Sequence, residues 1–180
     1  MKQEQQRVRD WMMKFGQETH NCNPVVPSLE VRKLRAKLIL EEALETIEGL
    51  GIIVFAKRNI YEDDSFEIGE LGFYEEQERT MYPEYKPLRP DLVKIADGIA
   101  DSLVVQLGTA VACGIDIQPV FEEVMRSNDS KLWKPEDLEF SKDDNEYHIK
   151  VLPCGNCLVK DKNGKVIKSP SYSPPNIQLM

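Results

Sequence analysis

A helix with an unusual charge pattern is predicted by the stretch 38-LILEEALETIEGL-50. Its residues are good helix formers, and Gly49 supplies a stop near its end. Four carboxylates are nevertheless set among its apolar residues: Glu41, Glu42, Glu45 and Glu48. A helix in a globular domain needs one apolar face for packing, so carboxylates on that face require a chemical reason.

The carboxylates continue an apolar row instead of forming a separate outer face. Residues three or four apart share one face of a helix. By this spacing Leu34 and Leu38 begin a row whose second half is carboxylate: Glu41, Glu45 and Glu48. Glu42 lies one residue beside the row. We therefore predict that the row faces the core and brings its carboxylates with it.

A second helix repeats the pattern within 91-DLVKIADGIADSLVVQLGTAVACG-114. Asp97 and Asp101 lead along one line into small and apolar residues: Val105, Gly108 and Ala112. Carboxylates on the inward lines of two helices repel one another unless a cation lies between them. Clustered oxygen ligands suit Mg²⁺, with Mn²⁺ as the alternative, and both ions also bind substrate phosphates. A solvated acidic face is the other interpretation of such clusters, and the residues leave both open.

The rest of the chain completes a mostly helical plan. Apolar spacing predicts further helices over residues 3–15 and 115–129, and the acidic helix is predicted to begin after Ser28 as its N-cap. The acidic, turn-rich segment 57–90 is predicted to be a long loop. Alternating β-branched residues around Asn163-Gly164 indicate a hairpin.

The predicted fold class is therefore all-α, a helical bundle of about four or five helices with a small C-terminal β-hairpin. We expect a helical domain over residues 1–146. The hairpin and the extended tail over residues 147–180 are expected to pack on the same domain.

Composition limits the function classes. The formal net charge is −8 and no basic patch is evident, which argues against nucleic acid as a partner. The N-terminus has no apolar signal core, and no run is judged long enough to span a bilayer, so no membrane partner is expected.

Four cysteines without an export signal predict reduced thiols in the cytoplasm. The pair Cys154 and Cys157 is interpreted as ordinary thiols, because His148 and the other candidates lack the spacing of a zinc site.

The acidic motifs resemble those of the all-α nucleoside triphosphate pyrophosphohydrolase superfamily, which includes MazG-like proteins and phosphoribosyl-ATP pyrophosphatases. The first family pattern, E-E-x-x-E, is matched in full from Glu41 to Glu45. The second, E-x-x-D, is matched at its last position by Asp101, while Gly98 stands in place of its Glu. Asp97, one residue earlier, is the candidate to supply the missing carboxylate.

Three later segments are similar to segments of phage and bacterial members of the superfamily: 108-GTAVACGID-116, 126-RSNDSKLW-133 and 164-GKVIKSPSYSPPNI-177. The resemblance covers about residues 30–177. It implies Mg²⁺-dependent hydrolysis of an NTP or dNTP to the monophosphate and pyrophosphate. It also implies a homodimer or homotetramer, in which neighbouring subunits complete the site.

The resemblance assigns roles residue by residue. Glu41 is the catalytic residue that would orient or deprotonate a water molecule. The expected metal ligands are Glu42, Glu45, Asp97 and Asp101. The expected substrate-binding residues are Asn128, Lys131 and Lys168.

Two other functions stay open. Gly98 favours a non-catalytic nucleotide or metal-binding regulator that kept the fold and lost part of the metal shell. The acidic segment 62-EDDSFEIGELGFYEEQE-78 favours a helical protein-interaction module.

Overall fold

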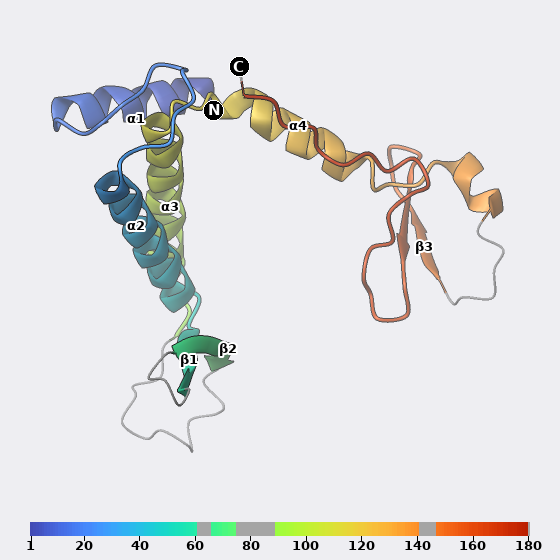
Figure 1. The fold of residues 1–180 in the computed structure, drawn as a ribbon. Coiled ribbons are helices and arrows are strands. Elements are labelled where there is room, and N and C mark those ends of the chain that lie inside the picture. Colours follow the sequence, from blue (N-terminus) through green and yellow to red (C-terminus); the bar gives the residue numbers. More distant parts are fainter. Residues whose placement is uncertain (61–65, 75–88, 141–146, 180) are drawn as a thin grey trace. The chain divides into compact units, whose positions relative to one another are not determined.

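The computed structural model describes residues 1–60, 66–74, 89–140 and 147–179 of the chain (Figure 1). This part contains four α-helices: α1 (Lys2–Lys14), α2 (Leu29–Gly49), α3 (Leu92–Ala112) and α4 (Ile117–Asp129). A 3-10 helix, η2 (Pro135–Phe140), follows α4. Two antiparallel hairpins complete it: β1 (Ile53–Ile60) with β2 (Phe66–Tyr74), and β3 (His148–Val151) with β4 (Cys157–Lys160). The predicted all-α class with a small C-terminal hairpin is confirmed.

Internal contacts divide the chain into two compact units. The N-terminal unit, Gln3–Ile115, contains α2, α3, the β1–β2 hairpin and nearly all of α1. The C-terminal unit, Asp116–Met180 with Met1–Lys2, contains α4 and the β3–β4 hairpin. The structure thus groups α4 with the C-terminal hairpin. That the tail packs on the helical domain stays a prediction.

Side-chain caps begin the two long helices at the predicted positions. Ser28 Oγ accepts a hydrogen bond of 3.3 Å from the backbone N–H of Val31. Asp91 caps α3 by accepting hydrogen bonds of 2.9 and 3.3 Å from the N–H groups two and three residues later. Gly114 follows α3 with a positive φ of 65°. The side chains of Ser28 and Asp91 satisfy backbone donors that a helix start leaves unpaired, and they confirm the predicted starts of the two long helices.

The two long helices pack closely because small residues meet at their interface. They run side by side and antiparallel (Figure 1). A Cβ atom on Gly98 would lie 2.6 Å from Thr46 Oγ1 and 2.9 Å from Thr46 Cα. A Cβ atom on Gly49 would lie 3.0 Å from the backbone N of Ile95. Thr46 Oγ1 also lies 3.4 Å from Ser102 Oγ. Larger side chains would force the helices apart.

The predicted inward row of α2 is corrected by the structure. Leu34 and the carboxylates that continue its row are exposed: Glu41, Glu45 and Glu48. The face of α2 that meets α3 instead carries Thr46 and Gly49. Around the helix axis, this face is rotated from the predicted row by roughly 100°, which is the rotation per residue of an α-helix. Small residues are required where the backbones of α2 and α3 come closest together. This requirement outweighs the number of apolar residues on the predicted row.

The first helix closes one end of the N-terminal unit. In Figure 1, α1 lies across the end of α3. Gln5 Nε2 donates a hydrogen bond of 2.6 Å to the carbonyl of Ile115, and the backbone N–H of His20 donates one of 3.0 Å to the carbonyl of Val111. Met12 is fully buried. Apolar packing, the side-chain hydrogen bond from Gln5 and the backbone hydrogen bond from the loop after α1 therefore hold this region against the end of α3.

The predicted long loop over residues 57–90 is partly wrong. Its first part belongs to the β1–β2 hairpin, in which Ile53 pairs with Tyr74 and Ile60 with Phe66. The β-branched residues at the start of β1 favour an extended conformation. Residues 61–65 and 75–88 lie outside the described residues, so a loop there stays a prediction.

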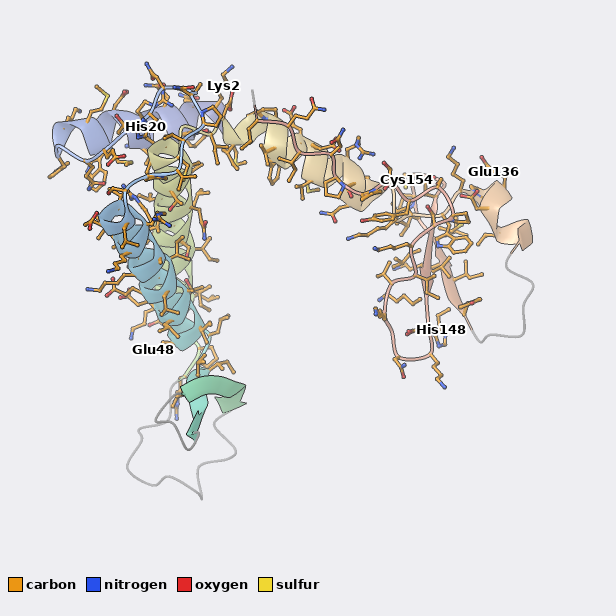
Figure 2. All side chains as sticks on the ribbon, in the orientation of Figure 1. Lys2, His20, Glu48, Glu136, His148 and Cys154 are labelled. Carbon is orange, nitrogen blue, oxygen red and sulfur yellow. The ribbon has the colours of Figure 1, made fainter. Side chains whose placement is uncertain are left out.

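The C-terminal hairpin turns earlier than predicted. The β3–β4 turn spans residues 152–156, where the N–H of Leu152 donates to the carbonyl of Asn156 at 2.8 Å. Asn163-Gly164 forms a second turn, after which Val166 bridges to Lys160. The small core of this unit consists of Trp133, Cys157 and Val159. Figure 2 shows Cys154 near the turn and His148 at the other end of the hairpin, so these two residues do not share a site.

One helix of the described residues, α3, is long and apolar enough to cross a membrane by length and composition. The expectation that no run meets this test is therefore wrong. The result is weak support for a span, because core helices of globular proteins pass the same test. Here α3 carries Asp97 and Asp101 and packs along α2.

Candidate active site

The predicted carboxylates gather on the N-terminal unit from two facing helices. Glu41, Glu42 and Glu45 come from α2, and Asp97 and Asp101 come from α3. Glu42 is half-buried and the other four are exposed. Figure 2 shows Glu48 at the end of α2 that leads into the β1–β2 hairpin. The antiparallel packing of α2 and α3 therefore assembles residues that are more than fifty positions apart in sequence.

Glu42 lies at the electrostatic centre of this cluster. Burial raises its pKa above the ordinary value, and the negative charges of four neighbouring carboxylates raise the pKa further. In order of their effect, these neighbours are Glu45, Asp101, Glu41 and Asp97. The predicted site residues thus act on one another through space. A bound cation would reverse this shift, because it favours the ionised carboxylate.

The donor set fits Mg²⁺ by its chemistry. All five side chains offer oxygen ligands, which hard divalent cations prefer, and they come from two rigid helices. Within the described part of the chain, no three His, Cys, Asp or Glu side chains lie close enough together to hold a metal ion as they stand. The carboxylates therefore form a shared negative field and not a closed coordination shell.

Gly98 explains the departure from the second acidic motif. At this position even a Cβ atom would lie within 3 Å of Thr46 Oγ1 and Cα, so the larger Glu side chain does not fit. Asp97, one residue earlier, is exposed and contributes to the field at Glu42. With the two helices packed this closely, a Glu at position 98 is excluded.

Glu41 has a cationic neighbour on its own helix. Lys37 Nζ lies 3.4 Å from Glu41 Oε1, one helical turn away, and both side chains are exposed. An exposed pair of this kind contributes little to stability.

A cavity of about 270 Å³ lies beside the carboxylates. Its apolar wall is formed by α1, α2 and α3: Val8, Trp11, Met12, Leu38, Val104 and Val105. Its polar lining is Gln17, Arg35, Glu42 and Asp101. An apolar hollow with a few polar groups is the usual form of a small-molecule site. Because Glu42 and Asp101 line it, the cavity and the carboxylate cluster are continuous.

Sequence reasoning missed Arg35, which is buried with 7% of its surface exposed. Burial lowers the pKa of its guanidinium. The available signal was spacing, since Arg35 lies two turns before Glu42 on the same face of α2. An arginine on the inward face of a helix is therefore a candidate functional residue, as a carboxylate is there.

The C-terminal unit brings together all three predicted substrate-binding residues. Lys131 Nζ donates a hydrogen bond of 2.7 Å to Asn128 Oδ1, and Lys168 Nζ lies 4.2 Å from the ring centroid of Tyr172. The pKa of Tyr172 is lowered, first by a hydrogen bond with Ser127 and then by Lys168 and Lys131. Tyr172 is thus a member of this cluster that the prediction did not include.

The comparison with protein families decides the class. The family model described as phosphoribosyl-ATP pyrophosphohydrolase matches residues 8–128, well over half of the chain. The chain belongs to the phosphoribosyl-ATP pyrophosphohydrolase family. This family is part of the MazG-like all-α superfamily that the acidic motifs predict. A comparison with curated proteins gives no match.

Membership of the phosphoribosyl-ATP pyrophosphohydrolase family fixes the reaction class. The protein is a hydrolase that acts on acid anhydrides, a pyrophosphohydrolase with a nucleotide substrate. The matched residues include all five carboxylates and Asn128. Lys131 and Lys168 lie beyond the match, and substrate binding by these two residues stays a prediction.

Proposed function

We propose that this pyrophosphohydrolase is Mg²⁺-dependent and converts a nucleoside or deoxynucleoside triphosphate to the monophosphate and pyrophosphate. The observation that supports the proposal is the field of four carboxylates around Glu42 at the edge of the cavity. A cluster of this sign attracts a divalent cation and repels a bare triphosphate. The metal is therefore required for binding as well as for chemistry.

In this proposal the ligands of the metal are Glu42, Glu45, Asp97 and Asp101. Bound Mg²⁺ would supply neutralisation of phosphate charge and a lower pKa for a water ligand. Glu41, next to the ligands in sequence, would accept the proton of the attacking water. The water oxygen would bond to the α-phosphorus as the bond from the α-phosphorus to the α–β bridging oxygen breaks, and pyrophosphate would leave with that oxygen.

The C-terminal cluster would bind substrate phosphates. Lys131 and Lys168 are point charges that both act on Tyr172, and Asn128 orients Lys131 through their hydrogen bond. Lysine ammonium groups bind phosphate oxygens by charge-assisted hydrogen bonds.

We further propose that the enzyme is a homo-oligomer, with a dimer as the smallest form. Four large apolar side chains on the two long helices are 43–60% exposed: Leu40, Leu44, Ile99 and Leu103. By helical spacing they lie on faces of α2 and α3 turned away from their mutual interface. A second copy of the helix pair would cover them as a four-helix arrangement.

Pyrophosphate release from a panel of NTPs and dNTPs, with Mg²⁺, Mn²⁺ or EDTA, tests the proposed activity. We expect release with metal, none with EDTA, and a loss of at least about a hundredfold in kcat/KM for Glu45→Ala, because one ligand is removed. Glu48→Ala is the matched control, since this carboxylate pairs with Lys94 at 3.9 Å and does not act on Glu42.

Two outcomes would contradict the proposal. Equal activity of Glu45→Ala and wild type would remove Glu45 from the metal site. Nucleotide binding with Mg²⁺ but without turnover of any panel member would instead support the regulator.

A further inference from the structure

Hydrogen bonds of the backbone and of neighbouring serines hold Tyr172 beside the end of α4. The N–H of Tyr172 donates a hydrogen bond of 3.0 Å to the carbonyl of Ser169. Ser169 Oγ donates one of 2.8 Å to the carbonyl of Ser130, and the N–H of Ser173 donates one of 3.0 Å to Ser130 Oγ. Ser169 is buried, with 5% of its surface exposed. The segment that carries Tyr172 is therefore fixed on α4 by bonds that do not use the tyrosine hydroxyl.

The hydroxyl of Tyr172 is an acceptor within the protein. It forms hydrogen bonds with the buried Ser127 and with Lys168, and both bonds lower the pKa of the phenol. An ammonium group has only donors, and a neighbour that lowers this pKa stabilises the phenolate by donating to it. A phenol has two acceptor lone pairs and one hydrogen of its own. Its lone pairs are thus engaged, while its hydrogen is suited to an acceptor on a ligand.

Two ammonium groups accompany this hydroxyl. Lys168 Nζ lies 4.2 Å from the centroid of the Tyr172 ring, and the positive charge of Lys131 also lowers the pKa of Tyr172. Lys131 donates one hydrogen bond to Asn128 Oδ1, and an ammonium group has further hydrogens to donate. Lys168 is exposed, and Lys131 and Tyr172 are partly exposed. A ligand can therefore reach all three donors, and a phosphate group has the charge and the acceptor oxygens that they require.

We propose that Tyr172 is a substrate-binding residue whose hydroxyl donates a hydrogen bond to a β- or γ-phosphate oxygen of the triphosphate. This inference rests on the proposed function and states which part of the substrate the C-terminal cluster holds. The β- and γ-phosphates carry most of the charge of a triphosphate, so they suit a cluster with two ammonium groups. Both phosphates leave as pyrophosphate, which the cluster therefore also binds as a product. The phenol adds a donor of fixed position to two flexible lysine side chains.

Calorimetric titration of the full chain with pyrophosphate, in the presence of Mg²⁺, tests the inference. Tyr172→Phe removes the hydroxyl and keeps the ring over which Lys168 lies. We expect this variant to bind pyrophosphate about tenfold more weakly than wild type, because one hydrogen bond to a charged group is lost. Its affinity for AMP, which has no β- or γ-phosphate, should not change. Ser127→Ala is the matched control: it breaks the same bond between Ser127 and Tyr172 but keeps the phenol, so it should lose less pyrophosphate affinity.

Equal pyrophosphate affinities of Tyr172→Phe and wild type would overturn the inference. Equal losses in Tyr172→Phe and Ser127→Ala would also overturn it, because the loss would then come from the position of the tyrosine and not from its hydroxyl. The same holds for a parallel loss of AMP affinity, or for no binding of pyrophosphate to wild type at millimolar concentration. Weaker pyrophosphate binding by Tyr172→Phe, in a protein that hydrolyses no triphosphate of the panel, would leave the phosphate site standing and overturn only the proposed function.

Discussion

At the scale of single residues, Gly98 shows how packing restricts a catalytic motif. The family pattern places a glutamate where this chain has glycine, and the sequence alone allows the interpretation of a lost ligand. The structure gives a steric reason, because Thr46 lies against the position. A carboxylate at residue 97 keeps the field at Glu42 without a side chain in the interface.

Gly98→Ala should destabilise the protein by about 1–3 kcal/mol, because the added methyl overlaps Thr46. An alanine on an open helical surface would instead stabilise it by up to about 1 kcal/mol. Urea unfolding measures the difference. Ala100→Ser, an exposed position on α3, is the control and should change stability by less than about 0.5 kcal/mol. A more stable Gly98→Ala protein would show that the helices are not in close contact here.

At the scale of elements, the sequence predicts the position of each helix along the chain better than it predicts which face of the helix packs inward. The caps at Ser28 and Asp91 are local signals, so the helix starts follow from a few neighbouring residues. The facing side of α2 depends on contacts with α3, which apolar spacing on one helix does not contain. For this reason the sequence predicts which carboxylates form the cluster, but it does not predict that Glu42 and Arg35 are the ones that face inward. The β1–β2 hairpin is not predicted, because both the end of β1 and all of β2 lie in an acidic segment whose composition is typical of a loop.

A second element, the C-terminal tail, is held on α4 by several hydrogen bonds, and the carboxylate of Glu123 accepts one of them. Glu123 accepts hydrogen bonds of 2.7 and 2.8 Å from Arg126 and one of 2.7 Å from the backbone N–H of Asn176. The bonds from Arg126, and then that from Asn176, lower the pKa of Glu123 from 4.5 to about 2. A lowered pKa in the folded state stabilises it above the unfolded value, and this contribution is lost as the pH falls.

Glu123→Gln should therefore lower the urea midpoint at pH 7. The difference from wild type should shrink as the pH falls from about 4.5 toward about 2, the window set by the two pKa values. Glu122→Gln is the matched control, because Glu122 contacts Gln118 and not the tail. A difference that stays constant over this window would show that ionised Glu123 does not hold the tail.

At the scale of the whole molecule, the exposed apolar faces of α2 and α3 predict self-association. Light scattering with size-exclusion chromatography should give wild type at least twice the chain mass. Leu44→Glu combined with Ile99→Glu should give the monomer, since each places a charge on the face to be covered. Val166→Glu, at a 41% exposed position in the C-terminal unit, should leave the assembly intact. A wild-type protein of single-chain mass would contradict the proposed dimer.

The central claim is the bond that the enzyme breaks. Phosphorus NMR of the products from a triphosphate in Mg²⁺ measures it directly, because pyrophosphate and inorganic phosphate give separate signals. The account predicts equal amounts of nucleoside monophosphate and pyrophosphate from the first turnover, with no nucleoside diphosphate. Release of inorganic phosphate with a diphosphate product, or an unchanged triphosphate across the whole panel, would contradict it.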